Sequence, residues 1–88
     1  MISQKVKIIN PTGLHLRPAA ELCKLAMEYE SNVTFRGAEG TFNAKSVLSV
    51  LGACVRRGDV IELTCEGPDE DDAIRALVES INKGLGEY

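Results

Sequence analysis

The sequence is poor in the residues that enzymes and cofactor proteins use for chemistry. Its 88 residues include one histidine, three cysteines, four Phe and Tyr residues and no tryptophan. Cys23, Cys54 and Cys65 form no Cys-x-x-Cys pair and cannot all be bridged. We therefore expect free thiols in a reducing cytoplasm, packed as small hydrophobic side chains, and neither a metal site nor a cofactor.

The sequence also lacks a long apolar run and an excess of positive charge. No stretch approaches 18 apolar residues and no basic segment precedes an apolar one, so we expect no membrane insertion, no secretory signal and a cytoplasmic location. Ten Lys and Arg against 13 Asp and Glu give a net charge of -3. This balance argues against nucleic acid as the partner, because phosphate backbones bind basic surfaces.

What is present predicts one small α+β domain over residues 1–88. Alternating polar and apolar residues predict strands at 5–8, 33–36, 41–43 and 60–65. Apolar stripes at helical spacing predict helices at 18–29, 45–52 and 70–83, with Ser46 and Asp69 as N-caps of the last two. The acidic residues after Asp69 suit a helix start better than a metal site. The order βαββαβα favours a two-layer sandwich, with an antiparallel sheet and all helices on one face.

The stretch 10–20 is the candidate functional site. Asn-Pro and Thr-Gly are turn signals, and Pro18 fits the first turn of a helix, so the helix should begin near His15 or Leu16. The imidazole then lies beside free backbone N–H groups at the positive end of a helix, where phosphate commonly binds.

This placement predicts a phosphoryl acceptor. A neutral imidazole nitrogen is a nucleophile, and the bound phosphoryl group would meet the N–H groups of Leu16 and Arg17 and the Arg17 guanidinium. No second catalytic residue is apparent, so we expect a carrier and not an enzyme.

The motif Gly13-Leu14-His15-Leu16-Arg17-Pro18-Ala19, together with Lys45-Ser46-Val47-Leu48, resembles HPr, the histidine-containing phosphocarrier of the bacterial sugar phosphotransferase system. The resemblance covers the whole chain and implies sheet order 1-4-2-3. It implies that His15 takes a phosphoryl group from enzyme I, as pros-phosphohistidine, and passes it to enzyme IIA domains of sugar permeases, with Arg17 beside it. Ser46 matches the serine modified by HPr kinase/phosphorylase, whose phosphoform partners a catabolite control protein. We expect a monomer.

Several readings stay open. Ser46 could be a helix cap and nothing more, and Val47, Leu48 and Leu51 could form a partner interface or pack in the core. Leu16 and Cys54 stand where the family commonly has alanine and glycine, which leaves partner preference open. One alternative is a regulatory module that acts through Ser46, although purely regulatory relatives lack the histidine. Another is an RNA-binding or ligand-binding ferredoxin-like domain.

Overall fold

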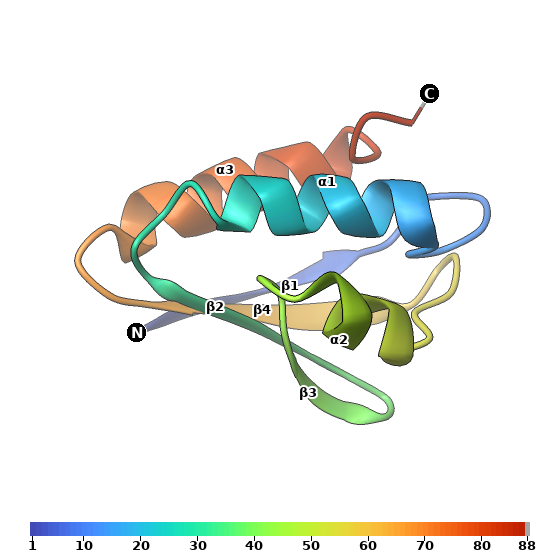
Figure 1. Cartoon of the computed structure of the whole chain (residues 1–88), viewed down its shortest axis with the longest axis horizontal. Helices are drawn as coiled ribbons and strands as arrows, with labels where there is room; N and C mark the ends of the chain where they lie inside the picture. Colours follow the sequence, from blue (N-terminus) through green and yellow to red (C-terminus); the bar gives the residue numbers. More distant parts are fainter. Residues whose placement is uncertain (88) are drawn as a thin grey trace.

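The computed structural model describes residues 1–87 and has the predicted βαββαβα order (Figure 1). The elements along the chain are β1 (Ile2–Lys7), α1 (Leu16–Ala26), β2 (Asn32–Gly37), β3 (Gly40–Asn43), α2 (Val47–Gly52), β4 (Val60–Glu66) and α3 (Glu70–Asn82). Within residues 1–87, no helix has the length and apolar composition needed to cross a bilayer.

The four strands form one antiparallel sheet in the order β1-β4-β2-β3, which confirms the implied order 1-4-2-3. β1 begins at Ile2, three residues earlier than its alternation predicts, because β4 offers partners from Val60 to Cys65 and pairs Cys65 with Ile2. Polar pairs cover the outer face of the sheet. The hydroxyls of Ser3 and Thr64 lie 2.8 Å apart, and Arg36 forms an ion pair with Glu62 at 3.0 Å.

The other face of the sheet carries the core, and α1 and α3 lie side by side over it (Figure 1). Alternate strand residues point toward these helices, among them Val6, Val33, Phe35, Ile61 and Leu63. The helices contribute the predicted apolar stripes, including Leu22 of α1 and Leu77 of α3, both fully buried. α2 packs against α1 and β3, near the edge where Phe42 stacks on Phe35 at 5.6 Å between ring centroids. Burying one face of each strand and helix therefore produces the sandwich.

The prediction that Asp69 caps α3 with its side chain is wrong. Asp69 occupies the N-cap position, but its carboxylate accepts hydrogen bonds from the backbone N–H groups of Glu30 and Ser31, at 2.8 and 2.9 Å, and from the Ser31 hydroxyl. These bonds, the hydroxyl bond foremost, lower the pKa of Asp69. The residue therefore joins the turn after α1 to the start of α3, an arrangement that local sequence does not reveal.

Candidate functional site

The loop that carries the histidine is fixed against the segment before β4. The N–H of Gly13 donates to the Asn10 carbonyl at 2.9 Å, and the N–H of Leu14 donates to the Val55 carbonyl at 3.0 Å. Gly13 has a φ of 69°, and a Cβ there would lie 2.2 Å from the Val55 carbonyl oxygen. Glycine is needed at this position both for its backbone conformation and for the close approach of the two loops.

His15 is the N-cap of α1, as the turn signals and Pro18 predict. Its carbonyl accepts the first helical hydrogen bond, from Ala19 at 2.9 Å, and its side chain is 42% exposed. The N–H groups of Leu16 and Arg17 belong to the first turn, where no residue four positions earlier is helical. The histidine therefore stands at an accessible helix N-terminus with backbone donors beside it.

The segment after α3 reaches the histidine from the other side. The Nε2 atom of His15 lies 2.9 Å from Oε2 of Glu87, and Oε1 of Glu87 accepts a 2.8 Å hydrogen bond from Nδ2 of Asn10. The same Asn10 nitrogen donates to the Gly84 carbonyl at 2.8 Å, and Asn10 is 1% exposed. The Asn10 bond foremost, then the His15 bond and the charges of His15 and Arg17, lower the pKa of Glu87.

This contact determines which ring nitrogen is available. An ionised carboxylate accepts hydrogen bonds and donates none, so Nε2 of His15 must carry the proton that Glu87 accepts. In the neutral ring, Nδ1 then holds the lone pair. Sequence reasoning missed Glu87 altogether, because 72 residues separate it from His15, and it took Asn10 for a turn signal alone.

The predicted regulatory serine lies at the N-cap of α2. Its hydroxyl oxygen accepts a hydrogen bond from the Ser49 N–H at 3.2 Å, which confirms the predicted cap. A bond from the Cys23 thiol to the Lys45 carbonyl, at 3.0 Å, ties this start of α2 to α1. Ser46 is half-buried, so the cap leaves part of the side chain accessible.

The candidate interface residues differ in burial. Leu48 is 82% exposed and Leu16 is 63% exposed, whereas Val47 and Leu51 are half-buried and Leu51 packs against the core. Val50, on the opposite side of α2, is fully buried. Leu16 and Leu48 are thus free to contact a partner, and Leu51 divides its surface between core and solvent.

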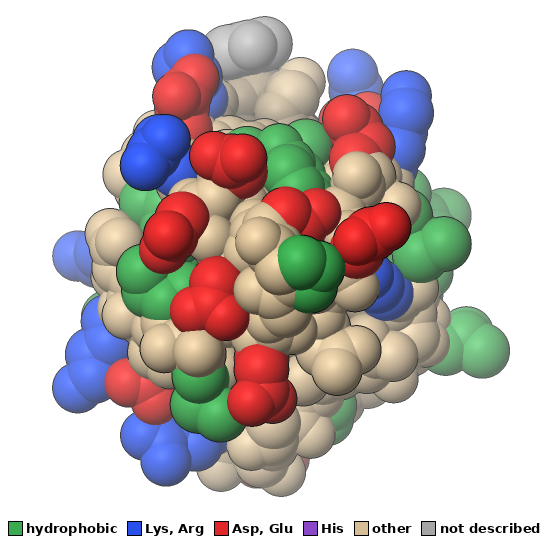
Figure 2. All heavy atoms as spheres, turned by 90° about the vertical axis from the view of Figure 1, so that its left-hand side faces the viewer, with side chains coloured by type: hydrophobic (Ala, Val, Ile, Leu, Met, Phe, Trp, Pro, Cys, Tyr) green, Lys and Arg blue, Asp and Glu red, His purple; other side chains and the backbone are tan. Residues whose placement is uncertain are grey.

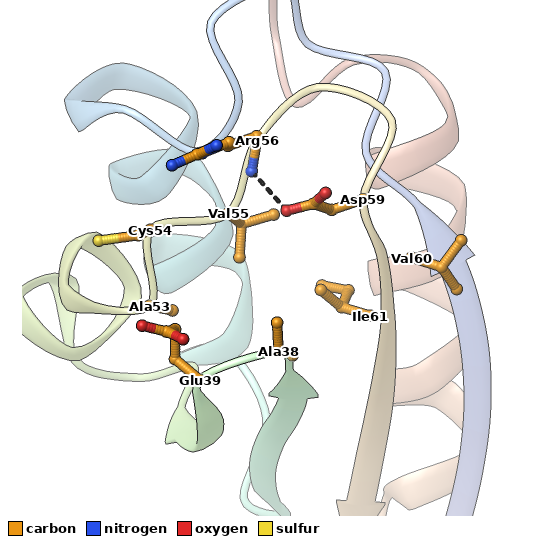
Figure 3. A pocket seen from close by; sticks show the side chains of 10 residues that line it. Ala38, Glu39, Ala53, Cys54, Val55, Arg56, Asp59, Val60 and Ile61 are labelled. Carbon is orange, nitrogen blue, oxygen red and sulfur yellow. Dashed lines mark hydrogen bonds between the residues drawn. The ribbon is translucent and has the colours of Figure 1, made fainter.

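Cys54 lies at the rim of a hollow of ≈ 380 Å³ between the β2–β3 turn and the segment before β4 (Figure 3). Ala38, Val55 and Ile61 point into the hollow, and the Cys54 thiol points away from it. The prediction that the cysteines are buried is wrong for Cys54, which is exposed, and holds for Cys65. Cys54 also has a φ of 53°, a left-handed conformation that glycine adopts without strain.

Negative charge gathers at one end of the molecule. Figure 2 shows acidic side chains spread over the end that appears at the left of Figure 1, which includes the β4–α3 turn. The first turn of α3 supplies Glu70, Asp71 and Asp72. α1 begins at the opposite end, so the acidic first turn of α3 lies away from His15 and adds little repulsion against an incoming phosphoryl group.

Comparison with known proteins agrees with this description. The family model described as "PTS HPr component phosphorylation site" matches residues 2–83. The phosphocarrier protein HPr of Neisseria meningitidis is 36% identical over 87 residues, covering 99% of this chain and 98% of its own. The phosphocarrier protein NPr of Escherichia coli K12 is also 36% identical, with coverages of 98% and 97%. A multiphosphoryl transfer protein of Vibrio cholerae is 40% identical over 84 residues, which are 92% of this chain and 21% of that protein.

Solved structures extend the likeness to three dimensions. HPr-C-His from Thermoanaerobacter tengcongensis superposes with a TM-score of 0.95 at 38% identity, covering 100% of this chain and 99% of that one. Crh of Bacillus subtilis, described as a catabolite repression protein, superposes with a TM-score of 0.76 at 30% identity, covering 99% and 100%.

The fold, the accessible histidine and the phosphocarrier relatives define a phosphotransfer carrier rather than a catalyst. The chain belongs to the HPr family of the phosphotransferase system. Two of the similar structures are dimers, an HPr of Thermoanaerobacter tengcongensis and Crh, so these relatives do not support the predicted monomer.

Proposed function

We propose that this protein accepts a phosphoryl group on His15 from phosphorylated enzyme I, which takes it from phosphoenolpyruvate, and passes it to enzyme IIA domains of sugar permeases in the cytoplasm. The observation that carries the proposal is the half-exposed imidazole at the start of α1, whose Nε2 donates to Glu87. Nδ1 is then the nucleophile, which gives the pros-phosphohistidine.

The proposed transfer exchanges one bond to phosphorus for another. The Nδ1 lone pair forms the new N–P bond while the bond between phosphorus and the donor atom of enzyme I breaks, and the donor atom keeps the electron pair. The phosphoryl oxygens meet the N–H groups of Leu16 and Arg17 and the Arg17 guanidinium. Because the site is open to solvent and partners, it stabilises the group without enclosing it, which suits a reversible relay.

Partner docking and regulation belong to the same surface. Leu16, Val47, Leu48 and Leu51 form the proposed interface, with Leu16 and Leu48 the most exposed of them. A phosphoryl group on Ser46 would sit at the N-terminus of α2, where the fold tolerates it, and would add a dianion and bulk beside that surface. HPr kinase/phosphorylase would install it, and a catabolite control protein would bind the product.

The test is phosphorylation with phosphoenolpyruvate and a bacterial enzyme I, followed by intact mass and acid treatment. We expect a gain of one phosphoryl group that acid removes and that His15→Ala does not acquire. An acid-stable gain, or full acceptance by folded His15→Ala, would contradict the assignment to His15. Ser46→Asp should slow acceptance, because a carboxylate supplies part of the phosphoserine charge. An unchanged rate would leave Ser46 as a helix cap.

A second candidate function is regulation through Ser46 with little sugar flux, and its support is the likeness to Crh. Onward transfer separates the two candidates. If the protein, phosphorylated on His15, donates to a sugar-specific enzyme IIA, the carrier role stands. If it accepts from enzyme I but donates to none of a panel of IIA domains, the regulatory role takes its place.

A further inference from the structure

We propose that Glu87 is a positioning residue for phosphoryl transfer, which holds the proton on Nε2 of His15 and so keeps Nδ1 ready as the nucleophile. The inference rests on the proposed function of His15 and adds a residue from the far end of the described chain. Its basis is the 2.9 Å contact between Nε2 of His15 and Oε2 of Glu87.

Glu87 is itself held in place. Its other oxygen accepts from Nδ2 of Asn10, and Asn10 is buried and bound to the Gly84 carbonyl as well. The segment that leads from α3 to Glu87 is fixed to that helix, because the N–H of Leu85 donates to the Ser80 carbonyl at 2.9 Å and the Leu85 side chain is fully buried. The carboxylate is therefore presented to His15 by an anchored support and not by a free side chain.

A carboxylate is the one common side-chain group that satisfies both neighbours. Asn10 and His15 each present an N–H, and the two carboxylate oxygens accept one each. A glutamine amide would offer one oxygen and one NH₂. Asn10 cannot turn its own oxygen toward that NH₂ without losing the Gly84 bond and facing the Gly84 carbonyl with another acceptor. The His15 ring must then change its tautomer, so that an unprotonated Nε2 accepts a hydrogen bond from the amide NH₂.

The carboxylate also assists the transfer electrostatically. When Nδ1 bonds to phosphorus while Nε2 keeps its proton, the ring gains a positive charge, and the Glu87 carboxylate lies against that charge. In the reverse step the Nδ1–P bond breaks, the ring takes the electron pair and becomes neutral again. No proton has to leave or arrive in either direction. A buried aspartate plays the corresponding part toward the histidine of a catalytic triad.

These hydrogen bonds predict that Glu87→Gln slows phosphoryl acceptance more than Glu87→Ala does. A loss of packing contacts alone would give the opposite order, because alanine removes more of the side chain. In Glu87→Gln, the amide oxygen accepts from Asn10 and the amide NH₂ donates to Nε2, which moves the ring proton to Nδ1 and removes its lone pair. In Glu87→Ala, the half-exposed ring contacts water and is free to adopt either tautomer. We expect acceptance from enzyme I to fall about tenfold or more in Glu87→Gln, and by less in Glu87→Ala.

The experiment measures the tautomer and the rate on the full chain. Long-range ¹H–¹⁵N correlations of the neutral ring report which nitrogen carries the proton, and rapid-quench assays with phosphorylated enzyme I give the acceptance rate. Glu79→Gln is the matched control, because Glu79 is an exposed carboxylate on α3 that pairs with Lys83. We expect it to match the unsubstituted protein in both measurements.

The proposal is supported by an Nε2–H tautomer in the unsubstituted protein, an Nδ1–H tautomer in Glu87→Gln, and the slowest transfer in Glu87→Gln. An unchanged tautomer in Glu87→Gln, or transfer slower in Glu87→Ala than in Glu87→Gln, would overturn it. If the unsubstituted protein accepts no phosphoryl group, the proposed function fails, and the tautomer measurement still decides whether Glu87 positions the ring.

Discussion

Replacing Gly13 with alanine tests whether the close approach of two loops builds the site. Gly13 has a φ of 69°, which costs an alanine about 1–2 kcal/mol, and the stiffer unfolded chain returns about 0.4–1 kcal/mol. The new Cβ would also lie 2.2 Å from the Val55 carbonyl oxygen, a backbone atom that must move. That oxygen accepts the Leu14 N–H, and losing a buried hydrogen bond costs about 1–3 kcal/mol.

We therefore expect Gly13→Ala to lower the free energy of unfolding by about 2–4 kcal/mol, and the melting temperature by about 10 °C or more in a domain of this size. Urea titration and thermal unfolding followed by circular dichroism measure both. Because this loop carries His15, acceptance from enzyme I should also slow under conditions where the variant is folded.

Alanine substitutions at two other glycines separate the cost of the backbone conformation from the cost of the contact with Val55. Gly58 has a φ of 88°, and within residues 1–87 no atom beyond its chain neighbours would lie within 4 Å of an added Cβ, so Gly58→Ala isolates the backbone cost. Gly52 has neither a positive φ nor, in the described chain, such a neighbour, and alanine there should be neutral or slightly stabilising. Equal losses for Gly13→Ala and Gly58→Ala would refute the argument, because the contact with Val55 would then cost nothing.

Three further changes have defined outcomes. Cys54→Gly should raise the free energy of unfolding by about 0.5–1 kcal/mol in urea titration, because glycine relieves the φ of 53°; a loss of stability would contradict this. Asp69→Asn should unfold at lower urea concentration at neutral pH. The folded pKa of Asp69 is depressed, so the stabilisation by its carboxylate is present above the unfolded pKa and is lost as the pH falls through the folded pKa; the two proteins should converge in acid, and a constant difference would disprove the assignment. In Leu48→Ala, the KM of enzyme I for this protein should rise severalfold while the free energy of unfolding stays unchanged. An unchanged KM would show that Leu48 does not belong to the interface.

Local sequence determined the elements of the fold and their order. Alternation and helical spacing predict four strands and three helices, and each has the predicted type in the structure. Ser46 caps α2 and the turn signals start α1 at His15, because both effects depend on residues within a few positions. The ends of the elements differ from the predicted ones where pairing with a distant strand decides them. Pairing with β4, for example, extends β1 back to Ile2. The two motifs were also sufficient to indicate the family.

Tertiary structure decided how the site is supported and what each side chain contacts. The Asp69 carboxylate accepts hydrogen bonds from the turn after α1 and not from its own helix. Only glycine fits at position 13, because the Val55 carbonyl, more than forty positions away in the sequence, lies too close for a Cβ. Glu87 reaches His15 across nearly the whole chain. Each of these residues has an ordinary local pattern, and its role depends on a partner that is near in space and distant in sequence. Periodicity and capping report short-range geometry, so the sequence by itself located the histidine, and only the folded chain supplied the carboxylate that orients it.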